Sequence, residues 1–265
     1  MSANASTGLM IELANVDVAS PVEDGRRVLE GVDWRVAAGN YWVIKSGLEE
    51  GADALFLTAA GALRPASGVV RLFGRDTSPF NPEDLLEQRL RISLVLSGGG
   101  RLFPELTVAE NVALPYCYHR NCELCATGEW FEKLLAFAGL EEWAERLPSE
   151  LPRAIILNVG LARGLCLKPE VLLLEHPAFG LELGQRRWLL EKLGQLSSGH
   201  PILDGRPLTI AVTTTEFQPW VGYGRQFGVI EGKRLRILAG EADARAADDA
   251  AGTQLIGRKV DLSER

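Results

Sequence analysis

The sequence contains no long apolar run, and this absence limits how the chain can meet a membrane. A membrane-spanning helix needs about eighteen uncharged residues in succession, whereas Arg, Lys, Asp or Glu interrupts every hydrophobic run here. Residues 1–9 are small and polar and lack the basic and apolar segments of a secretory signal. We therefore expect a cytoplasmic protein that is peripheral on the inner face of a membrane, through a partner.

Positive charge and cysteine are also scarce. The chain carries 28 Lys and Arg against 35 Asp and Glu, which gives a formal net charge of -7. Because nucleic-acid backbones are held by clustered cations, we expect no nucleic-acid partner. Four cysteines in 265 residues, without a secretory signal, do not indicate a disulfide scaffold.

Apolar runs with strand character alternate with segments of helical periodicity. Strands are predicted at residues 9–18, 33–36, 41–45, 69–73, 92–96, 171–174, 209–214, 227–230 and 235–238. Helices are predicted at residues 52–62, 130–137, 141–147, 155–167 and 185–196. Thr107 is expected to cap a further helix. The run Val171–Leu174 is uniformly apolar, which is typical of parallel strands covered on both faces.

This order of elements predicts an α/β fold. It has a parallel sheet core, an antiparallel β lobe at its amino-terminal side and a helical subdomain inserted at about residues 98–160. The expected domain covers residues 9–240. Residues 241–265 are rich in Ala and Asp, and we expect them to form a flexible tail.

Several segments resemble the ATP-binding subunits of ABC transporters in their order and spacing, over about residues 10–239. They are residues 28–32, 61–68, 102–104, 106–112, 162–165 and 168–174. The resemblance implies the P-loop NTPase-like ABC ATPase fold, ATP and Mg²⁺ as cofactors, an integral-membrane permease as partner, and a homodimer or a heterodimer with another such subunit. The Glu-Asn-Val-Ala-Leu-Pro run at residues 110–115 is most similar to the ATPase subunits of MCE-type lipid transporters, which implies a lipid cargo.

The stretch that corresponds to the family's phosphate loop is altered. A GxxxxGK[ST] loop holds phosphates with its backbone amides, neutralises them with its Lys and binds Mg²⁺ with its hydroxyl. In residues 46–54, Ala52 takes the Lys position and Asp53 takes the hydroxyl position. The resemblance places the nucleotide site at Gly47, Gly51, Ala52, Asp53, Ala54 and, in the Gln loop, Ser97.

Three carboxylates, of Glu49, Glu50 and Asp53, now stand where a triphosphate would lie. Each repels a phosphate charge by about 1 kcal/mol at 4 Å in water, whereas a helix N-terminus attracts it by about 0.3–1 kcal/mol. We therefore predict poor ATP binding. Two alternatives stay open: the loop binds ATP through its amides and a carboxylate-held Mg²⁺, or the acidic residues cap the helix that begins near Ala52.

The positions that the resemblance makes catalytic are also changed. Val171–Leu174 runs into Glu175-His176-Pro177, where the family has Asp-Glu-Pro. Glu175 could reach Mg²⁺ through water, and His176 replaces the glutamate that polarises the attacking water. An imidazole can act as a general base, but the favoured interpretation of His176 is a partly buried residue bonded to neighbouring backbone. Thr215 replaces the switch histidine.

The family's signature loop, Leu-Ser-Gly-Gly-Gln, aligns with Leu-Pro-Arg-Ala-Ile at residues 151–155. This stretch has neither the Ser hydroxyl nor the Gly amides that contact the γ-phosphate of the opposite subunit. Pro152 also removes a donor and stiffens the backbone. Both contributions to the paired ATP sites are therefore eroded, and hydrolysis is expected to be poor.

A separate cluster places Cys117, His119, Cys122 and Cys125 within nine residues. Cys and His are ligand types that suit Zn²⁺. Because there is one C-x-x-C and no second pair, the favoured interpretation is free thiols in a loop, with a metal site as the alternative.

Three hypotheses for the function follow. The first is a pseudo-ATPase subunit that acts as the structural or regulatory partner of a permease, which it contacts through residues 97–101 and 107–147. The second is a divergent but working transport ATPase. The third is a soluble interaction module that uses the same fold without a permease.

Overall fold

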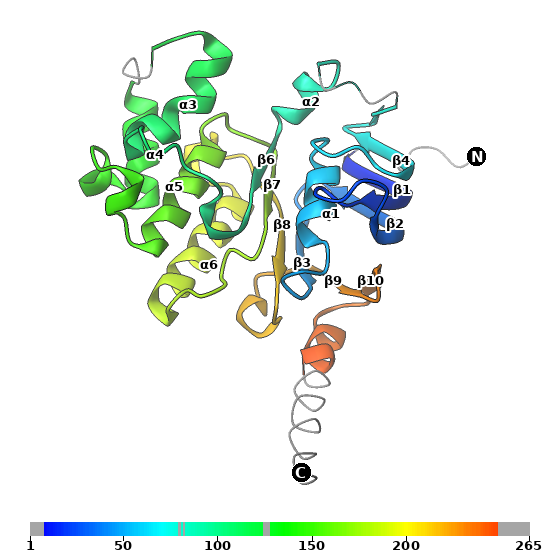
Figure 1. Ribbon diagram of the computed structural model, residues 1–265. Coiled ribbons are helices and arrows are strands. Elements are labelled where there is room, and N and C mark those ends of the chain that lie inside the picture. Colours follow the sequence, from blue (N-terminus) through cyan, green and yellow to red (C-terminus); the bar gives the residue numbers. More distant parts are fainter. Residues whose placement is uncertain (1–7, 79–80, 82, 124–127, 249–265) are drawn as a thin grey trace, which may run out of the picture.

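Two sheets and a helical lobe make up the part of the chain that the computed structural model describes, residues 8–78, 81, 83–123 and 128–248 (Figure 1). The central sheet has the strand order β10-β9-β3-β8-β7-β6. Its strands are β3 (Tyr41–Lys45), β6 (Ile92–Val95), β7 (Val171–Leu174), β8 (Thr209–Thr214), β9 (Gln226–Glu231) and β10 (Arg234–Leu238). All neighbours in it are parallel except β9 and β10, which form an antiparallel hairpin.

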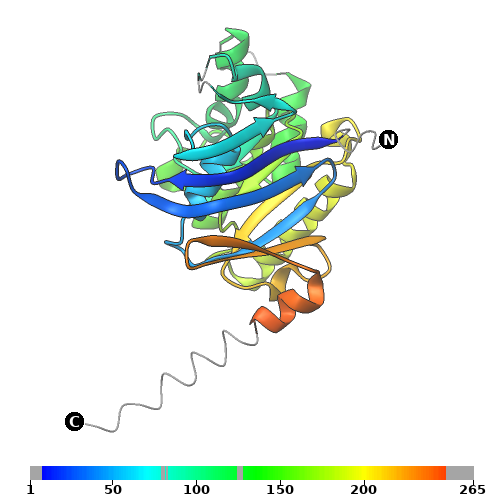
Figure 2. The ribbon, with the colours of Figure 1, turned by 90° about the vertical axis from the view of Figure 1, so that its right-hand side faces the viewer.

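The second sheet is antiparallel, with the strand order β2-β1-β4-β5. Its strands are β1 (Leu9–Ala19), β2 (Arg27–Ala37), β4 (Ser67–Leu72) and β5 (Arg75–Asp76). Figure 2 shows β1 and β2 lying side by side as the two longest strands in that view. The predicted α/β class, with a parallel core and an amino-terminal antiparallel lobe, is confirmed.

Between β3 and β10, the described residues form six α-helices. They are α1 (Ala52–Ala59), α2 (Leu86–Arg89), α3 (Val108–Arg120), α4 (Glu129–Ala138), α5 (Arg153–Leu165) and α6 (Leu183–Ser198). The helices α3, α4 and α5 come between β6 and β7 in the chain and form the helical lobe. Within the described residues, no helix has the length and apolar character needed to cross a membrane.

The strand β3 contributes to two hydrophobic cores. Tyr41 and Val43 pack with the helical lobe and α6, whereas Trp42 and Ile44 pack with α1 and the antiparallel sheet. This division follows from the strand geometry, since successive side chains point to opposite faces. All four side chains are buried.

Local interactions fix where the helical lobe starts and how closely it approaches the sheet. The predicted cap at Thr107 is confirmed: its Oγ1 accepts from the Glu110 amide at 3.2 Å, and the Glu110 carboxylate accepts from the Thr107 amide at 2.8 Å. In α5, a Cβ on Gly160 would lie 2.1 Å from the carbonyl oxygen of Gly99. Only glycine allows the helix to pass so near this backbone.

One predicted helix does not form. Residues 141–147 contain a single turn of 3₁₀ helix at Glu141–Trp143, and another turn follows at Pro148–Glu150. The left-handed Gly139 ends α4 just before this segment, and Pro148 cannot continue a helix that precedes it. Too few residues remain between the two for a stable helix.

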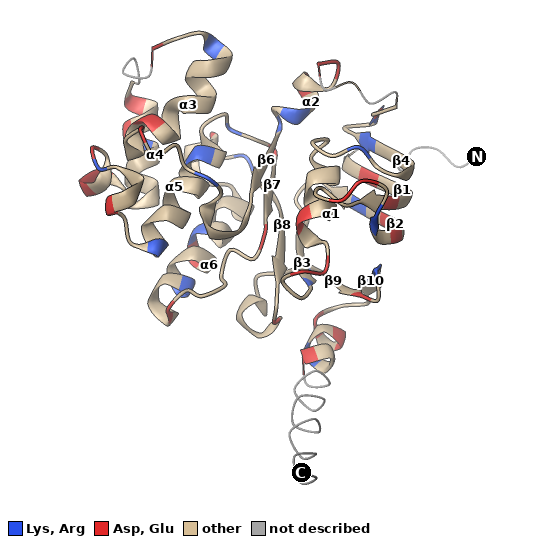
Figure 3. Ribbon diagram, viewed as in Figure 1, with Lys and Arg blue, Asp and Glu red and all other residues tan. Residues whose placement is uncertain are grey.

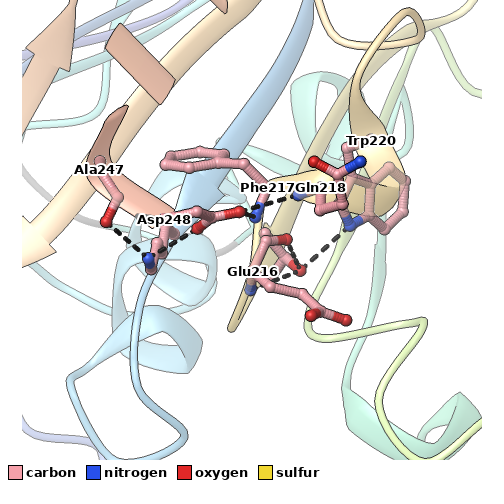
Figure 4. A network of polar contacts seen from close by, with 8 residues as sticks. Glu216, Phe217, Gln218, Trp220, Ala247 and Asp248 are labelled. Carbon is pink, nitrogen blue, oxygen red and sulfur yellow. Dashed lines mark hydrogen bonds and ion pairs between the residues drawn. The ribbon is translucent and has the colours of Figure 1, made fainter. Parts of the chain in front are cut away.

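The tail beyond Glu241 also differs from expectation where it is described. Residues 241–248 are helical, and Ala244 is fully buried against the larger core. Asp248 ends this segment with contacts to Lys45, Phe217 and Gln218, and Figure 4 shows the Asp248 carboxylate between these partners. Residues 249–265 lie outside the described residues.

Acidic and basic residues are interspersed along the ribbon of both sheets and of the helical lobe (Figure 3). Many of them form exposed pairs one helical turn apart, such as Lys133 with Glu129 and Arg187 with Glu191. Pairs of this kind contribute little to stability, but they keep the charge of the surface mixed.

Candidate functional site

The candidate site lies at the carboxyl ends of β3, β6 and β7, the edge of a parallel sheet at which ligands bind. Residues 46–51 connect β3 to α1. Gly51 has φ 82° and ψ 20°, which is a left-handed conformation, and a Cβ on it would lie 3.1 Å from Cβ of Val28. Both the backbone and the available space therefore require glycine at this turn.

The loop binds its own anion. Oε2 of Glu50 accepts a hydrogen bond from the backbone N–H of Gly47 at 2.6 Å. Backbone amides of this loop are the groups that would hold phosphates, and a bond to a carboxylate is among the strong ones. The interpretation of the acidic residues as caps is wrong, because no side chain caps α1: Glu50 bonds within the loop, and Asp53 lies in the first turn.

Glu175, which follows β7, meets Ser97, which follows β6. Oε2 of Glu175 accepts from the backbone N–H of Ser97 at 3.0 Å. Burial raises the pKa of Glu175, the Ser97 amide opposes this, and the Asp53 carboxylate raises the pKa further. The Asp53 and Glu175 carboxylates therefore repel each other. The family resemblance expects a Lys beside them, but the residue at that position is the buried Ala52.

His176 is buried, at 3% exposure, and has a left-handed φ of 42°. Its ring Nε2 lies 3.4 Å from Oγ of Ser46, and Nδ1 is buried without a hydrogen-bond partner among the described residues. Burial lowers the pKa of His176, against smaller opposing effects of the Gly47 backbone and the Asp53 carboxylate. The imidazole is therefore neutral at pH 7. It lacks the negative charge of the glutamate that the family resemblance expects at this position for activating water. The burial of His176 agrees with the favoured interpretation, but the hydrogen-bond partner of its ring is the Ser46 hydroxyl, where that interpretation expects neighbouring backbone.

A cavity of about 380 Å³ opens beside these residues. Its lining includes Leu48, Ser97, Arg153, Glu175, His176 and Phe179. Arg153 comes from the stretch that aligns with the signature loop, and a Cβ on Gly180 would lie 3.1 Å from its Nη1. The guanidinium of Arg153 thus packs against the Gly180 turn of its own chain.

At the position of the family's switch histidine, the hydrogen bonds are made by Thr214 next to Thr215. Oγ1 of Thr214 accepts from Nε1 of Trp220 at 3.0 Å and donates to the carbonyl oxygen of Glu216 at 2.8 Å (Figure 4). Thr215 is exposed and lines a cavity of about 250 Å³ together with His176. A threonine hydroxyl in this place has no titratable ring with which to contact a phosphate.

The structure brings most of the predicted positions together. Gly47, Gly51, Ala52, Asp53 and Ala54 lie in the loop and the start of α1, and Ser97, Glu175 and His176 face them from the neighbouring strand ends. The sequence reasoning missed the bond from Glu50 back to Gly47, for which an acidic residue three positions after a loop glycine is the available signal. It also missed that Arg153 lines the same cavity.

These residues do not fit ATP and Mg²⁺. The loop lacks the phosphate-binding Lys, one of its amides is taken by Glu50, and Asp53 and Glu175 add negative charge. A triphosphate would have to displace the Glu50 carboxylate and then lie beside it. Each carboxylate repels a phosphate charge by about 1 kcal/mol at about 4 Å in water. The start of a helix attracts that charge by only about 0.3–1 kcal/mol, so the repulsion is larger.

The Cys and His cluster does not converge on a metal site in the part of the chain that is described. No group of three His, Cys, Asp or Glu side chains there could hold a metal ion. Cys117 is buried in α3, and its Sγ donates to the carbonyl oxygen of Glu123 at 3.3 Å. His119 is exposed and packs against Tyr118, whereas Cys125 lies outside the described residues.

Comparison with known proteins supports the resemblance. A sequence model of the ABC transporter family matches residues 29–178, which is more than half of the chain. The ATP-binding protein YtrE of Bacillus subtilis is 27% identical over 71% of this chain and 83% of its own length. The macrolide export ATP-binding/permease protein MacB of Burkholderia pseudomallei is 29% identical over 93% of this chain but only 37% of its own length.

Solved structures share the fold. The dimeric ABC transporter cassette MJ0796 has a TM-score of 0.74 at 23% identity, over 88% of this chain and 100% of that one. The cbiO1 subunit of Clostridium perfringens, described as part of the ABC transporter complex cbiONQ, has a TM-score of 0.73 at 20% identity, over 97% and 96%. With the family match and the site geometry, these findings show that the chain belongs to the ABC transporter family and has the fold of its ATP-binding domain.

Proposed function

We propose that this chain is a pseudo-ATPase subunit that docks on the cytoplasmic side of a membrane permease and serves as its structural or regulatory partner. The observation that carries the proposal is the bond between the Glu50 carboxylate and the Gly47 amide. It fills the phosphate loop with an anion that belongs to the chain itself. The missing Lys at Ala52 and the neutral His176 point the same way.

The permease would contact residues 97–101 and the helical lobe at residues 107–147. Asn111 holds this surface in shape: its side-chain amide donates to the carbonyl oxygens of Phe103, Leu106 and Thr107, and its Oδ1 accepts from the Phe103 amide. Phe103, in the loop between these two stretches, is 51% exposed, and Tyr118 of α3 is 78% exposed. Exposed aromatic side chains on a rigid frame suit contact with another protein.

The names of the relatives support a permease partner, since MacB is described as an ATP-binding/permease protein and cbiO1 as part of a transporter complex. A pair of such subunits is supported by the dimeric cassette MJ0796. We propose a homodimer, or a heterodimer with an intact ATPase subunit, in which Pro152 and Arg153 replace the signature contacts. A lipid cargo is proposed from the run at residues 110–115, which forms the first turns of α3.

Titration with Mg-ATP tests the proposal. Isothermal titration calorimetry of the full chain should show no saturable binding at ATP concentrations up to the millimolar range, and a coupled phosphate assay should show no turnover. Low-micromolar binding with turnover would instead establish the divergent ATPase. Co-purification with a permease encoded beside this chain separates the proposed role from that of a soluble interaction module, which would bind no permease.

A further inference from the structure

A larger cavity lies at the opposite edge of the central sheet from the candidate site. Its volume is about 670 Å³, and its lining comes from α4, α6, the segment before β7 and the 3₁₀ turn at Pro201–Leu203. Lys168 and Asp204 precede the amino ends of β7 and β8, which places the cavity away from the phosphate loop. The cavity lining includes Trp130, Phe137, Lys168, Lys192, His200 and Ile202.

Aromatic rings and ammonium groups alternate in this lining. Nζ of Lys168 lies 4.5 Å from the ring centroid of Trp130, and Nζ of Lys192 lies 4.5 Å from that of Phe137. The ring of His200 lies 4.8 Å from the ring of Phe137. The Trp130 ring is held in place, since its Nε1 donates to the carbonyl oxygen of Cys166 at 3.3 Å. The cavity is therefore formed before any ligand arrives.

One cation of the cavity has no carboxylate to neutralise it. Lys133 pairs with Glu129 at 2.6 Å, and Lys168 pairs with Asp204 at 2.9 Å. Among the described residues, no carboxylate lies within ion-pair distance of Lys192. An ammonium group that faces a cavity with only aromatic partners is available to an anion.

His200 adds a second donor beside Lys192. Its Nδ1 accepts a hydrogen bond from the backbone N–H of Ile202 at 3.1 Å, so the proton of the neutral ring is on Nε2. Burial, and then the neighbouring Lys192 ammonium, lower the pKa of His200. At pH 7 the ring is therefore neutral, with Nε2–H as a donor.

We propose that this cavity binds a small amphipathic anion, a flat apolar body with a carboxylate or phosphate head. The head lies between Nζ of Lys192 and the Nε2–H of His200, and the body lies against Phe137, Trp130 and Ile202. The volume is within the range of about 300–1,000 Å³ that is typical of small-molecule sites. The proposal is independent of the phosphate loop and of the proposed function.

Calorimetric titration of the full chain with 2-naphthoate and with 2-naphthyl phosphate tests this site, and the two probes show which head group is preferred. We expect saturable binding of at least one of them. The uncharged 2-naphthalenemethanol should bind at least about tenfold more weakly, because it lacks the charge that Lys192 recognises. Equal binding of the alcohol, or no saturable binding of either anion below millimolar concentration, would overturn the proposal.

A pair of variants locates the binding. Lys192→Gln should lower the affinity for the preferred anion by about tenfold or more. Lys133→Gln, which removes a paired lysine of the same cavity, should change that affinity by less than about twofold. Far-UV circular dichroism and melting temperature would confirm that both variants remain folded, since Lys133 is exposed and Lys192 half-buried. Binding that survives Lys192→Gln unchanged would place the anion elsewhere and contradict the proposal.

Discussion

The ammonium nitrogen of Lys45 lies 2.7 Å from Oδ1 of Asp248, which joins the last residue of β3 to the carboxyl-terminal helical segment. The side chains are only 15% and 20% exposed. Oδ2 of Asp248 also accepts from the backbone N–H groups of Phe217 and Gln218, at 2.7 and 2.9 Å (Figure 4). One carboxylate thus fastens the helical segment to the strand before the phosphate loop and to the segment after β8.

We predict that Asp248→Ala lowers the free energy of unfolding by about 1–3 kcal/mol, because a mostly buried ammonium and two amides lose their acceptor. Urea denaturation followed by circular dichroism measures this change. Arg245→Ala on the same segment is the matched control, since it removes an exposed pair with Glu241 and should leave the midpoint unchanged. Equal midpoints for Asp248→Ala and the parent chain would show that the contact does not hold the segment.

Restoring the missing lysine alone is not expected to restore nucleotide binding. In Ala52→Lys, Glu50 still occupies the Gly47 amide and Asp53 still faces the phosphates. The triple variant Glu50→Ser, Ala52→Lys, Asp53→Ser removes both obstacles and should bind Mg-ATP at least about tenfold more tightly than Ala52→Lys, as expected when two like charges leave a site. Calorimetric titration compares the two, and similar affinities would mean that Glu50 and Asp53 do not block the loop.

The pH dependence of stability should reveal the cost of burying Glu175. Its pKa is raised above the ordinary value of 4.5, so above that pH the folded state holds more protons than the unfolded state, and stability falls as the pH rises through the raised pKa. Glu175→Gln removes this loss and keeps an oxygen for the Ser97 amide. Its melting temperature should exceed that of the parent chain at pH 7 and match it near pH 4.

Glu170 provides a control of opposite sign. The side-chain hydrogen bonds from Arg91, at 2.6 and 3.0 Å, lower its pKa. The stability that this pair contributes is present above the ordinary pKa and is lost as the pH falls through the lowered one. Glu170→Gln should therefore destabilise the chain at pH 7 and lose this effect in acid. The same direction for both variants would contradict the assignment of Glu175.

Two glycines in helices should respond oppositely to alanine. Gly160→Ala places a Cβ 2.1 Å from the Gly99 carbonyl oxygen, so α5 must move away from the 3₁₀ turn at Ser97–Gly99 that follows β6, at a cost of about 2 kcal/mol or more. Gly184, in the first turn of α6, has nothing within 4 Å of a Cβ. Gly184→Ala should stabilise the chain by about 0.5–1 kcal/mol through reduced backbone freedom in the unfolded state. Thermal denaturation of the two variants compares them.

The sequence predicts best those elements whose side chains meet one kind of environment. The bounds of β3, β7 and β8 are as predicted, because each is a short run that is buried throughout, except for the partly buried Lys45 at the end of β3. The absence of the phosphate-binding lysine can also be predicted from the sequence, since the lysine position is fixed by the spacing between β3 and Gly51. The helical segment at residues 241–248 could not be predicted, because its small Ala side chains give little hydrophobic periodicity. Its burial depends on the packing of Ala244 against a core that distant residues form.

The chemistry inside the phosphate loop shows the same division. Spacing places Glu50 in the loop, but its hydrogen bond to Gly47 depends on a side-chain conformation that no periodic pattern encodes. The Arg153 guanidinium likewise packs against the turn at Gly180, which comes from a different segment of the chain. Sequence patterns therefore indicate which groups are absent from such a site, whereas the groups that replace them become visible only when distant segments are brought together.

The strand β3 has a consequence for how the chain loses its structure. Its alternate side chains belong to two hydrophobic cores, one shared with the helical lobe and one with the antiparallel sheet. Neither core can melt without exposing two of the four buried side chains of β3 to water. The two lobes should therefore unfold together, in one transition whose calorimetric and van't Hoff enthalpies agree.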